Sequence, residues 1–257
     1  MRLNANFSER VVIRPDDYAW VSSPMPGVER MMLDRVGDEV ARATSLVRYQ
    51  PGSKFSPHVH GGGEEFFVLE GEFADEHGRY PAGHYLRNPI GTAHAPRVGP
   101  EGALIFVKLH QFDDGDSDQK VIDTRAREWL PGLVEGLSAM PLHEYSNGRD
   151  AEHVALVRWA PHTRFQPHRH WGGEEIMVLE GVFRDEHGEY PAGSWIRNSD
   201  QSRHTPYTRD EGALIYVKVG HLAPETTYGE RDADEMVGGH EAALKLGSAL
   251  STVESDF

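Results

Sequence analysis

The sequence predicts an all-β protein that consists of two similar domains. First, the segments 46–108 and 156–218 align without a gap, and more than half of their paired positions are identical. A repeat of this length indicates a duplicated domain rather than a small solenoid unit. Second, 27 glycines and 16 prolines divide the 257 residues into short segments separated by turns. Third, these segments have the periods of strands, and neither repeat shows a helical period of 3.6.

The length of the chain is compatible with two domains of about 100–150 residues. We expect a first domain over 1–118, which includes a leading arm, and a second over 119–228. The acidic segment 113–120 reads as the linker between them. In the tail 229–257, residues 232–250 have an acidic start and Ala/Leu spacing. These features are compatible with a short C-terminal helix, and disorder is the alternative.

Within each repeat the predicted elements follow the same order. Short strands over 43–49 and 155–159 end at a proline, and the β-rich sequences FFVLEGEF and IMVLEGVF predict the next strands. The turn-rich sequences DEHGRYPAG and DEHGEYPAG follow them. Apolar runs bounded by glycine, over 103–109 and 213–219, predict buried strands. The lead-ins that contain Trp20 and Trp129 are expected to form short strands and turns.

The composition excludes several classes of site and partner. The chain has no cysteine, which rules out disulfides and cysteine-based zinc sites. Its first residues lack the apolar core of a signal peptide, and no apolar run approaches the length of a spanning helix. A cytoplasmic protein is therefore expected. A net charge of −15 argues against a nucleic-acid or anionic-membrane partner.

Two histidines spaced two residues apart begin a candidate metal site. Residues i and i+2 of a strand point to the same face, so His58 and His60 present their imidazoles together. Three glycines then allow a tight turn, after which Glu64 returns on the next strand. His94 follows on a later strand. Three imidazoles and a carboxylate suit a first-row metal ion and leave positions for water or a bidentate ligand.

The same donors recur in the second repeat at a constant separation of 110 residues, which indicates two metal sites. The predicted ligands of the first site are His58, His60, Glu64 and His94. Those of the second are His168, His170, Glu174 and His204. Two further histidines, His77 and His187, lie in DEHG sequences that are typical of exposed hairpin tips. The acidic pairs beside them, 75–76 and 185–186, are expected to be solvated.

The neighbours of the ligands are candidate walls of a substrate pocket. By strand alternation, the face of Glu64 is shared by Phe66 and Val68, and that of Glu174 by Ile176 and Val178. Further wall candidates, with core packing as the alternative, are Tyr85, Phe106, Trp195 and Tyr216. Basic residues that recur inside apolar strands would either neutralise an anionic ligand or pair with acids on the outer face; they are Arg48, Arg158, Lys108 and Lys218.

At these motifs the chain resembles the cupin superfamily. The first cupin motif is matched by Gly52-(x5)-His58-x-His60-(x3)-Glu64-(x6)-Gly71, and the second by Gly83-(x5)-Pro89-x-Gly91-(x2)-His94. Val98 stands where the family usually has Asn. The second repeat keeps its four ligand positions, but it departs elsewhere, with His162 for the opening Gly, Ser199 for Pro and Gln201 for the turn Gly. These departures put the geometry of the second site in question.

The short segment between the motifs resembles, more narrowly, the cupin half of the ChrR anti-sigma factor. It is also similar to the related dioxygenases that cleave acetylacetone and 2,4'-dihydroxyacetophenone. The resemblance covers most of residues 20–220. It implies two jelly-roll (double-stranded β-helix) barrels in tandem, each with a divalent ion in its mouth. The implied cofactor is Fe(II) or Zn(II), up to two ions per chain.

Two classes of function follow from this resemblance. The first is a metal-dependent oxygenase for a small diketone or hydroxyketone, with Glu64 as the catalytic carboxylate. The second is a ChrR-like sensing or binding module, although the absent cysteines and the short leading arm do not suit a sigma-binding domain. A structural or storage role is a third alternative. A small-molecule ligand is the expected partner, and a homodimer is the expected assembly if the chain associates.

The two sites differ beside their ligands, where Gly61 in the first corresponds to Trp171 in the second. Trp171 would either stack on a substrate or close the mouth of the barrel. Since a catalytic metal keeps an open position, the first site is the expected reaction centre.

Overall fold

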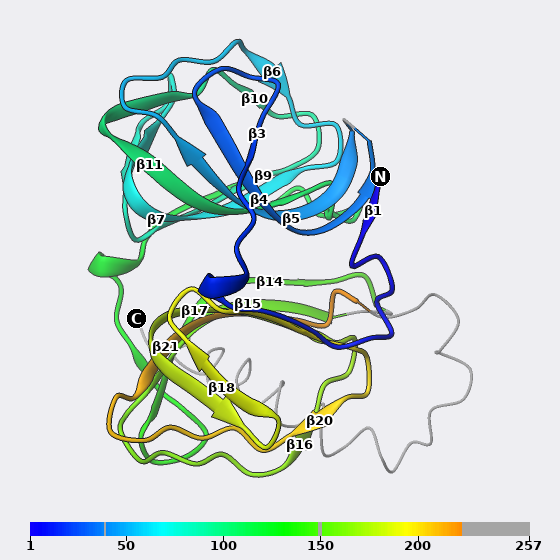
Figure 1. The fold of residues 1–257 in the computed structure, drawn as a ribbon, viewed down its shortest axis with the longest axis vertical. Coiled ribbons are helices and arrows are strands. Elements are labelled where there is room, and N and C mark those ends of the chain that lie inside the picture. Colours follow the sequence, from blue (N-terminus) through cyan, green and yellow to red (C-terminus); the bar gives the residue numbers. More distant parts are fainter. Residues whose placement is uncertain (39, 149–150, 223–257) are drawn as a thin grey trace, which may run out of the picture. The chain divides into compact units, whose positions relative to one another are not determined.

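A computed structural model describes residues 1–38, 40–148 and 151–222, and the described part is almost wholly antiparallel β-structure (Figure 1). The predicted all-β class is confirmed. The described residues include two short 3-10 helices, η1 (Pro15–Asp17) and η2 (Thr124–Ala126). The helix expected over 232–250 lies outside the described residues. No helix within these ranges combines the length and apolar character needed to cross a bilayer.

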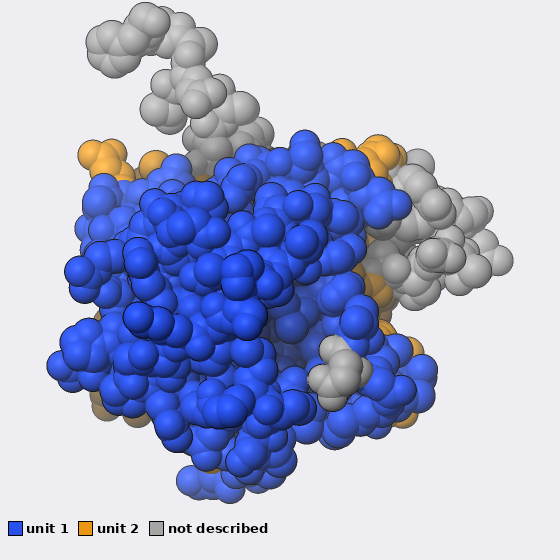
Figure 2. Space-filling model, turned by 90° about the horizontal axis from the view of Figure 1, so that it is seen from above, with its two compact units in different colours: residues 1–6, 16–127 blue, residues 7–15, 128–257 orange. Residues whose placement is uncertain are grey.

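The chain forms two compact units, which Figure 2 distinguishes by colour. Unit 1 consists of Met1–Asn6 and Asp16–Arg127, and unit 2 combines Phe7–Pro15 with the chain from residue 128 onward. The division therefore differs from the expected boundary at 118/119 in two segments. Residues 119–127 belong to unit 1, and residues 7–15 belong to unit 2.

Unit 1 contains a nine-stranded antiparallel sheet and a two-stranded ribbon. The main path of the sheet runs β1-β4-β5-β11-β7-β9-β12, with β3 beside β4 and β8 beside β7, and the ribbon pairs β6 with β10. The strands are β1 (Arg2–Leu3), β3 (Val21–Ser22), β4 (Val28–Gly37), β5 (Ala41–Tyr49), β6 (His58–Val59), β7 (Glu64–Ala74), β8 (Arg79–Pro81), β9 (His84–Asn88), β10 (Ala93–His94), β11 (Arg97–Leu109) and β12 (Lys120–Asp123).

Unit 2 repeats this arrangement with an eight-stranded sheet. Its main path runs β13-β14-β15-β21-β17-β19-β2, with β18 beside β17, and its ribbon pairs β16 with β20. The strands are β2 (Val11–Ile13), β13 (Leu130–Pro131), β14 (Leu137–Ser146), β15 (Ala151–Trp159), β16 (His168–Arg169), β17 (Glu174–Asp185), β18 (Gly188–Pro191), β19 (Trp195–Asn198), β20 (Arg203–His204) and β21 (Ala213–Val219).

The segments 7–15 and 119–127 each supply the last strand of a sheet. β2 precedes the first repeat in sequence, yet it pairs with β19 of unit 2, where Val12 lies opposite Ile196. β12 precedes the second repeat and pairs with β9 of unit 1, where Val121 lies opposite Leu86. Each repeat thus gives its leading strand to the other unit. The unpaired edge that β9 or β19 would otherwise expose is covered in this way.

Alternation along the strands decides which side chains form each core. In unit 1, Phe66, Val68, Leu86, Ile105 and Val107 belong to one buried cluster. Ile176, Val178, Ile196 and Ile215 occupy the equivalent cluster of unit 2. The prediction that Phe66, Val68, Ile176 and Val178 share the inner face is consistent with these clusters.

The other four wall candidates occupy the opposite face of their strands, which corrects the prediction for them. Each is the direct neighbour in sequence of a residue in one of these clusters, and successive strand residues point to opposite faces. All four are buried, but outside the two clusters of the barrel interiors. They are Tyr85, Phe106, Trp195 and Tyr216.

Candidate metal centre

Short ribbons bring the histidines of each repeat together. β6 pairs with β10, and β16 pairs with β20 (Figure 1). In these pairs His58 lies directly opposite His94, and His168 lies opposite His204. Glu64 is the first residue of β7 and is buried. The tight turn before it uses Gly63 at φ 77°, the left-handed region that glycine enters without a steric penalty.

The sequence departures in the second repeat leave its backbone unchanged at the turns. Gln201 has φ 60°, close to the 86° of Gly91, and His162 has φ 57°, close to the 69° of Gly52. The N–H of Gln201 donates to the carbonyl of His170 at 2.8 Å, as that of Gly91 donates to His60 at 2.9 Å. The second turn therefore delivers His204 in the same way as the first delivers His94.

In unit 1 the four predicted donors meet in one cluster. One ligand atom from each of His58, His60, Glu64 and His94 lies within 4.8 Å of the others. Oε2 of Glu64 is 3.3 Å from Nε2 of His60 and 3.6 Å from Nε2 of His94. Two metal bonds of about 2.1 Å at a tetrahedral angle separate their ligand atoms by about 3.4 Å, so this spacing suits one shared ion.

Unit 2 gathers the equivalent residues. The ligand atoms of His168, His170 and His204 lie within 4.8 Å of one another. The carboxylate of Glu174 lies beside these atoms, with Oε2 at 3.4 Å from Nε2 of His170 and 3.7 Å from Nε2 of His204. Both predicted ligand sets are thus brought together by the fold.

Hydrogen bonds at Nδ1 fix which nitrogen of each imidazole is free. In unit 1 Nδ1 of His58 lies 3.3 Å from the carbonyl oxygen of Ser56, and Nδ1 of His94 lies 3.3 Å from Oδ2 of Asp75. These oxygens only accept, so both Nδ1 atoms carry the proton. Nδ1 of His60 lies 2.9 Å from Oγ1 of Thr92, whose own proton is donated to the carbonyl of Pro89. In the neutral form of these three rings, Nε2 is therefore the nitrogen without a proton.

The Nε2 atoms facing the clusters lack hydrogen-bond partners among the described residues. This holds for His60, His94, His170 and His204, and all four atoms are buried. A buried nitrogen lone pair without a partner is costly, and a metal ion would satisfy it. The donor set of imidazole nitrogens with one carboxylate therefore fits a divalent first-row metal ion at each cluster.

Burial and mutual repulsion keep most of these imidazoles neutral. Burial, with contributions from His94 and His58, lowers the pKa of His60 to about 4. Burial and the neighbouring imidazoles likewise lower the pKa of His168 to about 4. His204 is the exception: burial lowers its pKa, but Glu174 and Asp185 together outweigh this and raise it above the ordinary value. Neutral imidazole is the form that binds a metal.

The carboxyl group of Glu64 also responds to its surroundings. Burial is the largest cause of a pKa raised to about 7; the hydrogen bond from Asn88 opposes this shift, and Asp75 adds to it. A cation beside the carboxylate would favour its ionised form. The protein thus holds an acid that is poised near neutral pH and that a bound metal would keep charged.

Residues outside the predicted set hold the ligands in place, and the sequence did not identify them. Asn88 donates from Nδ2 to Oε2 of Glu64 at 3.0 Å. Asp75 accepts at Oδ1 from the hydroxyl of Tyr80 and from the amides of His77 and Gly78, which leaves Oδ2 for His94. The expectation that Asp75 is a solvated turn residue is wrong, because the turn folds its side chain inward, where it is buried.

The same supports recur in unit 2. Asn198 donates to Oε2 of Glu174 at 2.8 Å, and Asp185 is buried and lies 3.4 Å from Nδ1 of His204. The expected solvation of Asp185 is therefore wrong as well. The histidines next to these aspartates, His77 and His187, are exposed as predicted.

The recurring basic residues lie on the outer face, away from the clusters. Arg48 lies 3.6 Å from Glu29, and Lys218 lies 2.7 Å from Glu152. Nζ of Lys108 donates to Thr44 at 3.1 Å, and Arg158 packs over the ring of Trp129 at 4.1 Å. The alternative of outer-face pairing is thereby favoured over neutralisation of a ligand in the barrel.

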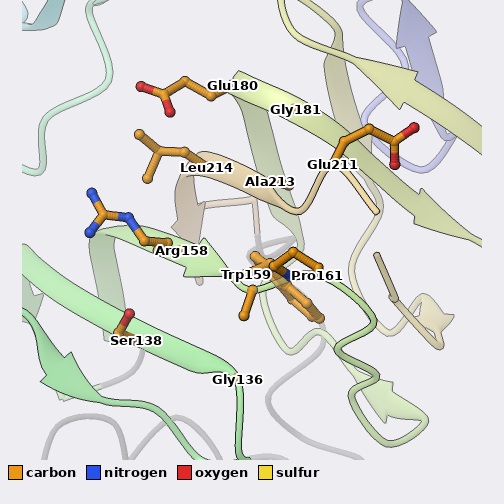
Figure 3. Close-up of a pocket in the computed structure, with 11 residues that line it drawn as sticks. Gly136, Ser138, Arg158, Trp159, Pro161, Glu180, Gly181, Glu211, Ala213 and Leu214 are labelled. Carbon is orange, nitrogen blue, oxygen red and sulfur yellow. The ribbon is translucent and has the colours of Figure 1, made fainter. Parts of the chain in front are cut away.

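A hollow of about 270 Å³ in unit 2 lies apart from the histidines (Figure 3). Arg158, Glu180 and Glu211 project around it, and Trp159 contributes to its wall. Glu211 is already paired with Arg184, at 3.0 Å from each terminal nitrogen. None of the histidines of the second cluster lines this hollow, so it is not the metal centre.

Solved structures of known proteins share this fold. A putative dioxygenase from Nostoc punctiforme is 19% identical, with a TM-score of 0.65 over 90% of this chain and 87% of that one. Protein YlbA from E. coli is 16% identical, with a TM-score of 0.64 over 86% and 94%. Oxalate decarboxylase from Bacillus subtilis, which has Mn(II) centres, is 14% identical, with a TM-score of 0.58 over 83% and 78%. At these identities the likeness concerns the fold alone.

Sequence comparison identifies the family. No curated protein sequence matches the chain. The family described as ChrR Cupin-like domain matches twice, over residues 8–113 and 117–223, which together span most of the chain. Each match contains one complete set of three histidines and a glutamate. The chain therefore belongs to the ChrR cupin-like domain family, of which it carries two copies in tandem.

Proposed function

We propose that this protein is a metal-binding bicupin that acts as an oxygenase on a small diketone or hydroxyketone. The observation that carries the proposal is the convergence of three imidazoles beside a buried glutamate in each unit, where two buried Nε2 atoms have no hydrogen-bond partner among the described residues. The proposed ligands are His58, His60, Glu64 and His94 in unit 1 and His168, His170, Glu174 and His204 in unit 2. Fe(II) is the proposed ion for oxygenase activity, and Zn(II) is the alternative.

A divalent ion at this position would supply Lewis acidity and, in the case of iron, a redox partner for O₂. The chain itself supplies the surroundings. Phe66 and Val68 belong to the apolar cluster next to Glu64, which disfavours water near the site. Burial raises the pKa of Glu64 to about 7 in the chain without an ion, and a bound cation would keep the carboxylate ionised and able to accept a proton.

The first site is the proposed reaction centre. His58 and Gly61 are exposed, whereas their counterparts His168 and Trp171 are partly buried. The ring of Phe165 also packs against His168, with the ring centroids 4.9 Å apart. A substrate that brings two adjacent oxygen atoms needs open positions on the ion, and the more exposed site offers them. The proposed partner is accordingly a small molecule.

The test begins with the metal content of protein purified without added metal. The parent chain should carry up to two ions, and replacing both His58 and His60 by alanine should remove about one ion per chain. An unchanged metal content in this double variant would refute the assignment of ligands. O₂ consumption over a panel of small diketones and hydroxyketones then tests the activity. A matched control replaces the exposed His77 by alanine, which should leave both readouts unchanged.

A second candidate function is a metal- or ligand-sensing module without catalysis. It is favoured by the family match, since that family is described by ChrR rather than by an enzyme. The two proposals give different results in the same experiment. A sensor would bind metal at the same residues and would bind a small molecule without consuming O₂.

A further inference from the structure

One arginine outside the proposed ligand set touches the supports of two ligands in unit 2. Arg10 lies in the segment 7–15, which precedes the first repeat and belongs to unit 2. Its Nη2 lies 2.7 Å from Oδ2 of Asp185 and 2.7 Å from the hydroxyl oxygen of Tyr190. Its Nε donates to Oδ1 of Asn198 at 2.8 Å. A single guanidinium thus holds a carboxylate, a phenol and an amide.

Two of these partners hold a proposed ligand each. Asn198 donates from Nδ2 to Oε2 of Glu174 at 2.8 Å. Asp185 places Oδ2 at 3.4 Å from Nδ1 of His204. The guanidinium is planar and rigid, so bonds from its Nε and Nη2 fix Asn198 and Asp185 relative to each other. The positions of Glu174 and His204 therefore depend on Arg10 through one intermediate residue each.

The burial of these groups makes the contact costly to lose. The side chain of Asp185 is 1% exposed and that of Arg10 is 26% exposed. Removing one partner of a buried ion pair leaves the other charge uncompensated. Without Arg10, Asp185 would have to find another partner or move, and His204 would lose its fixed orientation.

Unit 1 has no equivalent arginine at the matching position. Arg87 and Arg197 are equivalent positions of the two repeats. Lys120 of β12 lies opposite the first, and Val11 of β2 lies opposite the second. The residues before them, Gln119 and Arg10, are therefore equivalent as well. Gln119 is uncharged and exposed. The asparagine and aspartate supports recur in both units, whereas the residue at this position of the leading strand differs between them.

We propose that Arg10 is a positioning residue of the second metal centre, so that the segment 7–15 is a working part of that centre. Site two is then complete only when β2 is paired with β19, and its metal affinity depends on a strand from the start of the chain. This inference rests on the proposed metal binding by unit 2.

The test measures Zn(II) affinity in the full chain by competition with a chromogenic chelator. His58→Ala and His60→Ala are combined to leave only site two. In this background Arg10→Met should weaken Zn(II) binding by about 10–100-fold, the usual effect of removing an outer support. It should also change the visible spectrum of Co(II) bound at the site. Arg10→Lys keeps the positive charge but lacks the planar guanidinium, and it should lose less Zn(II) affinity than Arg10→Met.

Two controls separate positioning from general stability. Glu9→Gln alters the exposed neighbour of Arg10 in the same segment, and Gln119→Met alters the matching position of unit 1. The Zn(II) affinity of both control variants should stay within about threefold of that of the background. Circular dichroism verifies folding.

The outcomes distinguish this inference from the proposed function. Unchanged or tighter Zn(II) binding in Arg10→Met, with an unchanged Co(II) spectrum, overturns the role of Arg10. If Arg10→Met does not fold, Arg10→Lys decides: a loss beyond threefold with an altered spectrum supports the role, and parent-like values overturn it. If the background binds no Zn(II), or still binds it after His168→Ala, the proposed metal site itself is wrong.

Discussion

At the scale of single residues, each proposed ligand of unit 1 has a hydrogen-bond partner outside the donor set. Nδ1 of His94 meets Asp75, Oε2 of Glu64 receives Asn88, and Nδ1 of His60 meets Thr92. Such contacts select one tautomer and one ring orientation, which raises metal affinity without adding a ligand. The chemistry of the site is therefore spread over more residues than the ion would touch.

The sequence predicted the ligands but not their supports, and the reason is physical. The H-x-H spacing and the later Glu and His determine a donor set whatever surrounds it. Asp75 precedes a hairpin tip, where carboxylates are usually solvated, and only the folded turn shows that its side chain points inward. Tyr85 and Phe106 were placed on the wrong face because aromatic character does not indicate the parity of a strand position.

One prediction at this scale concerns the two glutamates. Glu64→Ala should reduce O₂ consumption much more than Glu174→Ala, because the first site is the more exposed. A loss of about 10²–10⁴-fold is expected for a carboxylate that acts in proton transfer. Metal content measured beside the rates separates loss of the ion from loss of the acid. Equal losses would contradict the assignment of the reaction to the first site, and a larger loss from Glu174→Ala would place it in unit 2.

At the scale of elements, a turn keeps its conformation although its sequence changes. Gly91 and Gln201 both occupy the left-handed region at the turn that delivers the last histidine. Pairing of the ribbons and the bond from the turn N–H to His60 or His170 impose this conformation on either residue. The strands of the repeats could be predicted from their apolar periods. Retention of the second turn could not, because Gln rarely takes this conformation.

These two turn positions give opposite predictions for stability. Gln201→Gly should raise the free energy of unfolding by about 0.5–1 kcal/mol, because relief of left-handed strain exceeds the greater entropy of glycine in the unfolded chain. Gly91→Ala should lower it by a similar amount. A Cβ at position 91 meets no atom within 4 Å, so the cost comes from the backbone alone. Urea unfolding measures both, and destabilisation by Gln201→Gly would show that the side chain itself matters.

At the scale of the whole molecule, the exchange of leading strands makes the sheet of each unit depend on a strand from the other repeat. β2 completes the sheet of unit 2, and β12 completes that of unit 1. The repeat revealed two domains, and the acidic segment 113–120 suggested a cut between them. The repeat could not reveal the exchange, because both lead-ins have similar sequences and their pattern does not assign either strand to a particular sheet. A cut at 118/119 would separate unit 1 from β12 and leave β2 without its sheet.

Counterpart valines on the exchanged strands provide a test of this arrangement. Val12 lies opposite Ile196 and packs against the core cluster of unit 2, while Val121 lies opposite Leu86 and is 54% exposed. Val12→Asp should therefore lower the free energy of unfolding by about 1–3 kcal/mol, since a charge enters a partly apolar site. Val121→Asp, at the matching position, should stay within about 0.5 kcal/mol of the parent.

Hydrogen–deuterium exchange locates the effect along the chain. In Val12→Asp, faster exchange should appear in β19 and β17 of unit 2, far from residue 12 in sequence, because β2 protects the edge of that sheet. The strands β7 and β9 should keep the protection they have in the parent. If protection is lost instead in β9, the leading strand belongs to its own repeat and the exchange is wrong. Loss confined to residues around Val12 would mean that β2 adds nothing to the stability of the sheet that it joins.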